Sequence, residues 1–435
     1  MSKVFSLLSP LSLLSLFSPL SLLSQTPTPA PPQKAAILIM GATAHLGNGQ
    51  VIENSAIAFE GGKLTIVADA TLIRLDPKSF GKIYEASGKH VYPGFIAPDT
   101  RLGLVEIEAA RPTRDFTEVG EINPNARSIV AYNTDSELIP TIRSNGVLLA
   151  QVIPTGGTVS GTSSVVQLDA WNWEDATYRA DDGIHLNWPT PRTRSFGFGA
   201  PPTDQKNEQY DKNVLALRQF FDEARAYVQQ PTPEVQNPRF EAMRGLWDKK
   251  QNLYVHTDNA RTIQESVLFA KNYGLRTVLV GANDAWLVAD FLKTQEVPVI
   301  LSRTQRLPSR EDEDVDQPYK TAAQLYEKGV LFAFSMDGAW QQRNLPFQAG
   351  QAVGFGLPKE AAVSALTLNT AKILGIDGTC GSLEQGKDAT LFISEGDALD
   401  MRTCKVTAAF IQGREINLDN KHKQLNKRYE EKYRQ

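Results

Sequence analysis

The stretch LYVHTDNARTIQESVLFAKNYGLRTVLVGANDAWLVADFLKTQEVPVIL, residues 253–301, decides the fold. It holds three short apolar runs separated by two segments of helical pattern: Leu253–His256, Ala260–Tyr273, Thr277–Val280, Ala282–Leu292 and Val297–Leu301. Strands that alternate with helices in this way pair in parallel, because each helical crossover lets the next strand start from the same end of the sheet. The stretch therefore predicts a parallel sheet covered by helices.

The alternation of strand and helix continues on both sides of this stretch. Apolar runs at Val147–Ile153 and Val330–Phe334 add strands, and Tyr319–Glu327 adds a helix. A chain of 435 residues has room for a barrel of about 250 residues and a further unit. The number of repeats and the length favour an α/β fold with a closed (β/α)8 TIM barrel. Periodicity alone leaves an open doubly wound sheet as the alternative.

Both ends of the chain contain short strands instead of these repeats. Ala36–Met40 and Ala56–Phe59 lie between turns near the N-terminus, and Asp388–Ile393 and Val406–Ile411 repeat the pattern near the C-terminus. We therefore predict a small β-sandwich side domain that is formed from both ends of the chain. The expected boundaries are 35–92 and 376–418 for this domain, 93–375 for the barrel, and 419–435 for a C-terminal helical tail.

The first residues have the layout of a secretory signal peptide. Lys3 precedes the apolar run Phe5–Leu23, which is rich in Leu, Ser and Pro, and a polar, Pro-rich stretch follows. We predict a signal peptide at 1–24 and a linker at 25–34. A transmembrane anchor is the alternative, which the prolines within the run disfavour. The expected product is exported, periplasmic or secreted, without membrane attachment after cleavage of the signal.

The overall composition is that of a soluble globular protein. Hydrophobic residues make up 41% of the chain and charged residues 22%, and the formal net charge is -4. A weakly acidic chain of this kind presents no electrostatic surface for a polyanion. Nucleic-acid binding is therefore excluded as the main function.

Two C-terminal features remain open from sequence. Cys380 and Cys404 could form a disulfide in an oxidising compartment, or they could stay unpaired as small core residues. In the tail, Leu425, Tyr429 and Tyr433 recur at helical spacing. This spacing favours a terminal helix packed on the barrel over a partner site.

Three passages frame the barrel region: Ala86–Ile96 (ASGKHVYPGFI), Ala365–Gly375 (ALTLNTAKILG) and Gly381–Leu391 (GSLEQGKDATL). In this order and spacing they resemble the amidohydrolase superfamily, specifically its imidazolonepropionase-like branch. In that family such segments lead into the first barrel strand, close the barrel and return to the small sheet. The resemblance implies a TIM barrel whose chemistry lies at the carboxyl ends of the strands. It also implies metal-dependent hydrolysis of carbon–nitrogen bonds.

The chain departs from the family's metal-binding pattern. The first strand normally ends in a His-x-His pair, and the resemblance puts Asp99 and Arg101 at these two positions. His256 matches the fifth-strand histidine, and Asp337 matches the eighth-strand aspartate, which binds metal and is the catalytic general base. The sixth strand offers Val280–Ala282 in place of a histidine, and no convincing bridging lysine is found.

Three hypotheses follow for this site. Since Arg101 is permanently protonated and offers no lone pair, the leading hypothesis has its guanidinium replace the ion and pair with Asp337 and Asp99. In the second hypothesis, Asp99, His256 and Asp337 hold one divalent ion, zinc or similar. In the third, His256 and Asp337 are hydrogen-bonded interior residues with no shared role. We therefore expect no cofactor or else a single divalent metal.

Further candidate residues lie near the predicted strand ends. We expect a structural or loop role for His185, not ligation. The Gly-rich segment with Gly156, Gly157 and Ser160 lacks the ending of a phosphate-binding P-loop and is predicted to line a substrate pocket. Trp171 would add an aromatic wall to that pocket. A plain hairpin that packs its tryptophans is the alternative.

The leading functional hypothesis is an exported amidohydrolase-like protein whose hydrolysis of carbon–nitrogen bonds is impaired or lost. It would act as a binding or non-catalytic subunit beside a homologous amidohydrolase or a second copy of itself, with a pocket for a small molecule or peptide. The alternative is an active hydrolase of cyclic amides or small peptides that uses a mononuclear metal site. Metal content separates the two.

Overall fold

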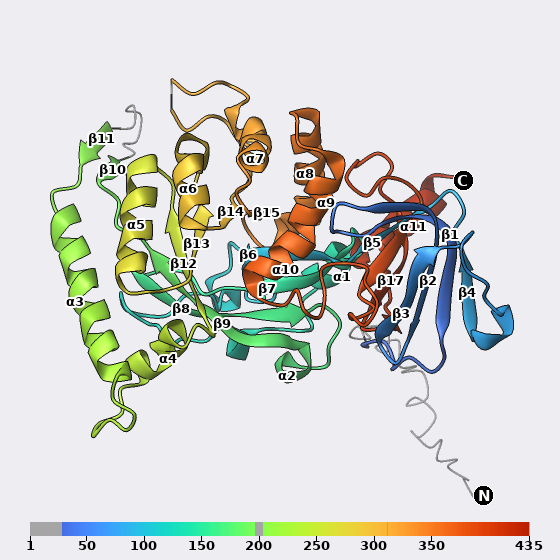
Figure 1. Cartoon of the computed structure of the whole chain (residues 1–435), viewed down its shortest axis with the longest axis horizontal. Helices are drawn as coiled ribbons and strands as arrows, with labels where there is room; N and C mark the ends of the chain where they lie inside the picture. Colours follow the sequence, from blue (N-terminus) through green and yellow to red (C-terminus); the bar gives the residue numbers. More distant parts are fainter. Residues whose placement is uncertain (1–27, 196–202, 311, 435) are drawn as a thin grey trace, which may run out of the picture.

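The computed structural model describes residues 28–195, 203–310 and 312–434 (Figure 1). Two sheets of eight strands organise this part of the chain, one formed by its middle and the other by its two ends. The predicted signal peptide lies outside the described residues. Within the described residues, no helix is long and apolar enough to cross a membrane.

The barrel sheet has the order β15-β14-β13-β12-β9-β8-β7-β6. Its strands are β6 (Phe95–Thr100), β7 (Val147–Val152), β8 (Val159–Gln167), β9 (Thr177–Asn187), β12 (Asn252–Thr257), β13 (Thr277–Gly281), β14 (Val299–Leu301) and β15 (Phe332–Phe334). The two edge strands, β6 and β15, contact each other, so that the sheet is nearly closed. The structure therefore supports the predicted α/β barrel architecture.

One strand of the barrel, β8, runs antiparallel to both of its neighbours, β7 and β9. The chain reverses directly after β7 through Gly156 and Gly157, whose φ angles of 91° and 64° suit glycine. The connection at 153–158 is too short for the helical crossover that a parallel strand needs. The expectation of a purely parallel (β/α)8 barrel is wrong at this strand.

Helices cover the outside of the barrel (Figure 1). They are α1 (Leu138–Arg143), α2 (Trp173–Ala176), α3 (Tyr210–Val228), α4 (Pro238–Trp247), α5 (Ala260–Asn272), α6 (Ala289–Gln295), α7 (Gln317–Glu327), α8 (Leu345–Gly354), α9 (Lys359–Leu366) and α10 (Leu368–Leu374). In α5, the apolar residues Ile263, Val267 and Ala270 recur on one buried face, and the Asn259 side chain caps the first turn by accepting from the Thr262 N–H. Amphipathicity and capping thus agree with the predicted position of this helix.

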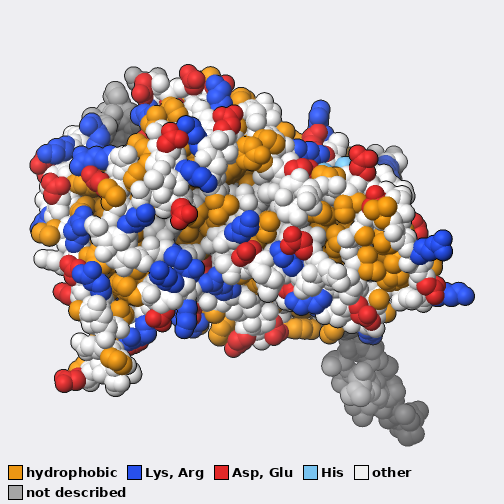
Figure 2. Space-filling model, viewed as in Figure 1, with side chains coloured by type: hydrophobic (Ala, Val, Ile, Leu, Met, Phe, Trp, Pro, Cys, Tyr) orange, Lys and Arg blue, Asp and Glu red, His pale blue; other side chains and the backbone are white. Residues whose placement is uncertain are grey.

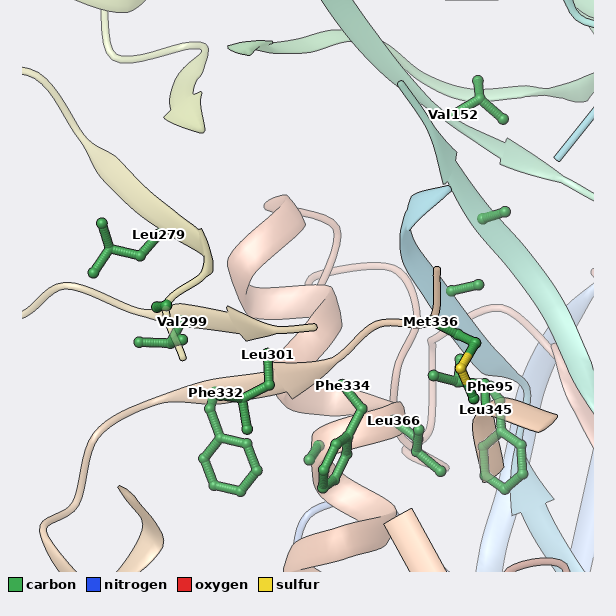
Figure 3. Packing of buried hydrophobic residues seen from close by; sticks show 14 of the residues in the cluster. Phe95, Val152, Leu279, Val299, Leu301, Phe332, Phe334, Met336, Leu345 and Leu366 are labelled. Atoms are coloured by element: carbon green, nitrogen blue, oxygen red, sulfur yellow. The ribbon is translucent and has the colours of Figure 1, made fainter. Parts of the chain in front are cut away.

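The apolar side chains of the barrel strands and covering helices form one large core. Figure 3 shows Phe332 and Phe334 of β15 packed near Leu301 of β14, with Phe95 of β6 and Met336 beside Leu345 of α8. Each fully buried side chain of this size contributes roughly 1.5–3 kcal/mol to stability. This core fixes the strand ends on which the candidate site is built.

The second sheet has the order β18-β17-β16-β5-β1-β2-β3, with β4 paired to β1. Its strands are β1 (Ile37–His45), β2 (Val51–Glu60), β3 (Lys63–Asp69), β4 (Lys82–Glu85), β5 (His90–Pro93), β16 (Leu391–Ser394), β17 (Val406–Ile411) and β18 (Arg414–Glu415). Both ends of the chain therefore meet in one sheet, through the antiparallel pair β5–β16. That these strands form a separate β-sandwich domain with the predicted boundaries stays a prediction.

A buried ion network joins this sheet to the barrel. Asp169, which follows β8, accepts hydrogen bonds from Arg143 at 2.5 Å and from Arg414 of β18 at 2.8 Å. It also accepts the backbone N–H of Ala30 at 2.9 Å. Segments from both ends of the chain are thus tied to one carboxylate of the barrel.

The C-terminal tail forms the predicted helix, α11 (Lys421–Tyr433), but no residue of this helix is buried. Leu425, Tyr429 and Tyr433 are exposed, so these three side chains do not pack on the barrel as expected, whereas the His422 ring at the start of the helix lies 5.1 Å from the Trp340 ring. Three apolar side chains among many charged ones bury too little surface to hold the helix down. The visible face of the molecule likewise intersperses acidic and basic side chains, in keeping with the small net charge (Figure 2).

The two cysteines, whose pairing the sequence left open, are both free thiols, and they pack with different core clusters. A two-stranded sheet also lies outside the two large sheets, formed by β10 (Arg192–Ser195) and β11 (Thr203–Lys206). Short 3-10 turns complete the fold, at Pro77–Ser79, Arg111–Thr113, Ser128–Ala131, Ala285–Val288 and Trp340–Asn344.

Candidate functional site

Three side chains converge at the carboxyl ends of barrel strands. Asp99 of β6, His185 of β9 and His256 of β12 each offer one ligand atom, and these atoms lie within 4.8 Å of one another. The strands bring them together because β9 and β12 are adjacent parallel strands, in which His185 pairs with Tyr254 and His256 with Asn187. Asp99 and His256 are therefore juxtaposed as predicted, and His185 joins them.

Asp99 has an unusual backbone and a buried carboxylate. Its φ angle is 53°, in the left-handed region that only a few non-glycine residues adopt. Oδ1 is buried with no hydrogen-bond partner among the described residues, and it lies 3.9 Å from Nε2 of His256. Burial raises the pKa of Asp99, while the nearby His256 lowers it. A buried oxygen of this kind lacks a partner that a cation would supply.

The two histidines face each other directly. Nδ1 of His185 lies 2.9 Å from Nε2 of His256, and the His185 ring stacks on Tyr254 with centroids 4.7 Å apart. Burial holds the pKa of His185 well below its usual range, and the neighbouring His256 lowers it further. The neutral imidazole that results keeps a lone pair, which is the form that binds metals.

The expectation of a merely structural role for His185 overlooked its position. The run Gly183–Leu186 resembles the strand Leu253–His256, because each is a short apolar run that contains one histidine. That likeness was the signal available in the sequence. It was missed because the segment follows two aspartates and was interpreted as a loop, whereas it forms the end of β9.

The Arg101 guanidinium does not form the predicted ion pairs in the described part of the chain, although its charge is close enough to lower the pKa of Asp99. The Arg101 guanidinium lies 3.7 Å from Oε1 of Glu108 and stacks over the Phe116 ring at 4.7 Å, and no ion pair joins it to Asp99 or Asp337 in the described part of the chain. The left-handed backbone at Asp99 breaks the regular alternation of the strand. Two residues on, the Arg101 side chain therefore does not share the position of the Asp99 side chain.

Asp337 follows β15 and lies near this group without belonging to it. Its side chain is 65% exposed, and its Oδ2 lies 3.8 Å from Nε of Arg303. The charge of Asp337 is close enough to raise the pKa of Asp99. Asp337 thus stands beside the three converging residues as an accessible carboxylate.

One carboxylate and two imidazoles are a donor set that divalent transition metals accept. With ligand distances of about 2.0–2.2 Å, two ligand atoms of one ion lie roughly 3–4 Å apart. The separations of 2.9 Å and 3.9 Å around His256 fall near this range. The residues therefore fit one divalent ion.

At the end of β13, where the family has a histidine, Asn283 instead donates to Asp258 at 2.8 Å.

The predicted pocket residues divide into two groups. Asn187, the register partner of His256, donates to the Gly157 carbonyl at 2.7 Å and to Ser160 Oγ at 3.0 Å. Gly156, Gly157 and Ser160 therefore lie at the same barrel end as the histidines. Trp171 follows the antiparallel strand β8, so it lies at the opposite end, with 65% of its surface exposed. Its predicted role as a pocket wall is wrong.

Sequence comparisons with known proteins point to one family. The model of the Amidohydrolase family matches residues 241–416. An imidazolonepropionase from Syntrophobacter fumaroxidans is 38% identical over 82 residues, which are 18% of this chain and 19% of that protein. The matched part thus spans about a fifth of the length of this curated relative.

Solved structures share the fold over most of the chain. An amidohydrolase from Thermotoga maritima MSB8 aligns with a TM-score of 0.72 and 22% identity, covering 88% of this chain and 99% of the other. A Xaa-Pro dipeptidase with bound methionine aligns with a TM-score of 0.57 and 14% identity, covering 88% and 100%. At these identities the likeness shows the shared fold.

Proposed function

We propose that this chain is a member of the amidohydrolase superfamily and that it hydrolyses carbon–nitrogen bonds with one divalent ion. The ion would be held by Asp99, His185 and His256. The proposal rests on one observation: three ligand atoms from three strands lie within 4.8 Å, and the Asp99 oxygen among them is buried without a partner. We propose cyclic amides or small peptides as the substrate class.

Each side chain has a definite task in this proposal. A divalent ion supplies positive charge that polarises a carbonyl and acidifies water. His185 is kept neutral by burial and presents a lone pair. Asp337 is accessible and only loosely paired with Arg303, so it can accept a proton from water and return it to the leaving nitrogen. The Gly157 carbonyl is held by Asn187 and helps to shape the rim on which a substrate would rest.

A second candidate function is the non-catalytic binding subunit. Two observations favour it: the end of β13 offers no ligand, and His185 and His256 already bond to each other at 2.9 Å. Under this proposal the fold would serve assembly with a homologous amidohydrolase or a second copy. The argument that Arg101 neutralises the site no longer supports it, because Arg101 pairs with Glu108.

Export is part of both proposals. It is supported by the layout of residues 1–24, in which a lysine precedes an apolar, Ser- and Pro-rich run. N-terminal sequencing of the protein from its native host would test it. A start near Gln25 is expected, and a chain that still begins at Met1 in the soluble cell fraction would contradict it.

Metal analysis separates the two functions. The protein is purified without chelators, and bound metals are quantified for the wild type, Asp99→Asn, His256→Gln and the control His422→Gln. The enzyme proposal expects about one equivalent of zinc or manganese, lost in the first two variants and kept in the control. Hydrolysis of a panel of cyclic amides and dipeptides should be found in the proteins that bind metal and lost in the two variants that do not. Absence of metal after incubation with zinc and manganese would overturn the enzyme proposal.

A further inference from the structure

The backbone of Asp99 departs from the regular ladder between β6 and β7. The pairing passes from Ala97 with Ala150 directly to Thr100 with Val152, so that Pro98 and Asp99 together oppose Gln151. This is the two-against-one arrangement of a β-bulge, which re-aims a side chain at the end of a strand. The left-handed φ of 53° at Asp99 belongs to this distortion. Such a conformation persists only where its surroundings hold it.

A side chain supplies the hydrogen bond at this point. The Asp99 N–H donates to Oε1 of Gln151 at 3.1 Å, and Gln151 is fully buried on β7. This hydrogen bond therefore depends on which end of the Gln151 amide faces Asp99. If the amide were reversed, its NH2 group would meet the Asp99 N–H, and two donors would face each other.

Asp182 determines the direction of that amide. Its carboxylate is fully buried on β9 and accepts from Gln151 Nε2 at 2.8 Å, Ser163 Oγ at 2.8 Å and the Tyr254 hydroxyl at 2.6 Å. Burial raises the pKa of Asp182, whereas the hydrogen bonds from Tyr254, Ser163 and Gln151 lower it. Because Oδ2 of Asp182 accepts from Gln151 Nε2, the NH2 end of the Gln151 amide faces Asp182 and Oε1 is left for Asp99. The network also reaches a second candidate ligand, because the Tyr254 ring stacks on His185.

Resting on the metal site proposed above, we propose that Gln151 and Asp182 are positioning residues, which hold the Asp99 carboxylate in place for the ion. Asp182 acts through Gln151, and Gln151 acts on the Asp99 backbone. Neither side chain is among the three converging ligands. Outer-shell partners of this kind typically change metal affinity about 10–100-fold when they are replaced.

Two variants test the two steps of this arrangement. Gln151→Met removes the acceptor of the Asp99 N–H without changing the size of the side chain greatly. Gln151 Nε2 and the Tyr254 hydroxyl share Oδ2 of Asp182, and Ser163 donates to Oδ1. Asp182→Asn removes the negative charge that strengthens these bonds and leaves one oxygen for the three donors, so it should loosen the hold on the Gln151 amide. The control is Ser163→Ala, which removes one donor to Asp182 and a long 3.3 Å acceptor of Gln151 Nε2, but leaves the 2.8 Å bond from Gln151 to Asp182 and the contact between Gln151 and Asp99. Circular dichroism and thermal unfolding establish that each variant is folded.

The first measurement is amide hydrogen exchange of the peptide 95–101 in the metal-free protein. We expect exchange at least tenfold faster in Gln151→Met and Asp182→Asn, and unchanged exchange in Ser163→Ala. The second measurement is the Kd for Zn²⁺ by calorimetry, expected to be at least tenfold weaker in the first two variants and within threefold of wild type in the control. If Gln151→Met fails to fold, both the exchange and the Kd for Zn²⁺ are measured on Asp182→Asn.

The outcomes distinguish this inference from the proposed function. Folded variants that exchange and bind Zn²⁺ like the wild type would overturn the positioning role and leave the metal site intact. If the wild type binds no Zn²⁺ but the variants show the expected exchange pattern, the proposed metal site is wrong. Gln151 and Asp182 would then hold the Asp99 backbone in place without serving an ion. Equal weakening in Ser163→Ala would also overturn the inference, since any loss from the buried network would then have the same effect.

Discussion

Replacing Asp169 should destabilise the contact between the barrel and the second sheet. The side chain of Asp169 is 3% exposed, and that of Arg143 is 5% exposed. Asp169→Asn removes the negative charge but keeps the shape, so the Arg143 guanidinium is left buried without a counter-charge. Breaking a buried pair from one side costs about 3–5 kcal/mol. Arg414, at 16% side-chain exposure, is closer to water and should add less.

Urea unfolding followed by circular dichroism measures this loss. An exposed pair provides the matched control: Lys405 and Glu395 lie 2.8 Å apart with side chains 69% and 43% exposed, so Glu395→Gln should cost at most about 1 kcal/mol. In the double variant Arg143→Met/Asp169→Leu, the whole pair is replaced by apolar groups, and most of the stability should return. A loss below about 1 kcal/mol in Asp169→Asn, equal to that of the control, would refute the reasoning.

Three further predictions concern the core, the site and the thiols. Phe332→Ala opens a cavity in the fully buried barrel core and should lower the free energy of unfolding by about 3–5 kcal/mol, measured by urea unfolding. Arg101→Ala should leave the Kd for Zn²⁺ within threefold of wild type, because Arg101 pairs with Glu108; tighter binding would restore the ion-replacement hypothesis. Burial raises the pKa of Cys404 to about 11. At pH 8 roughly one Cys404 thiol in a thousand is then ionised, and reaction should become faster as the pH rises toward 11. Thiol titration should find both cysteines after denaturation without reductant, and finding none would indicate a disulfide.

Much of the barrel could be predicted because its strands carry their own pattern. The runs at Leu253–His256 and Thr277–Val280 are short, apolar and followed by helices, and both are strands in the structure. The direction of β8 could not be predicted in this way. The residues of β8 fit a buried strand that runs in either direction. The six-residue connection before it is too short for a crossover, and this makes β8 antiparallel to β7.

The site was predicted in part for a related reason. The resemblance to the amidohydrolase superfamily identified Asp99 and His256, because it aligns them with the family's ligand positions at the ends of the first and fifth strands. The direction of the Arg101 side chain depends on the left-handed backbone at Asp99, two residues earlier. Residue spacing does not reveal this φ angle. The contribution of His185 depends on which strands are neighbours, since β9 lies beside β12 across 64 intervening residues, 188–251. Such pairings are properties of the folded sheet.

The antiparallel direction of β8 also bears on the order in which the barrel can assemble. β7, β8 and β9 are adjacent in the sheet and in the chain, with connections only at 153–158 and 168–176. Short connections of this kind close rapidly and lose little chain entropy. The contact between β6 and β15, in contrast, joins residues near 95 to residues near 334. The three-stranded meander can therefore act as an early folding nucleus, and closure of the barrel beside Asp99 must await the synthesis and folding of everything in between.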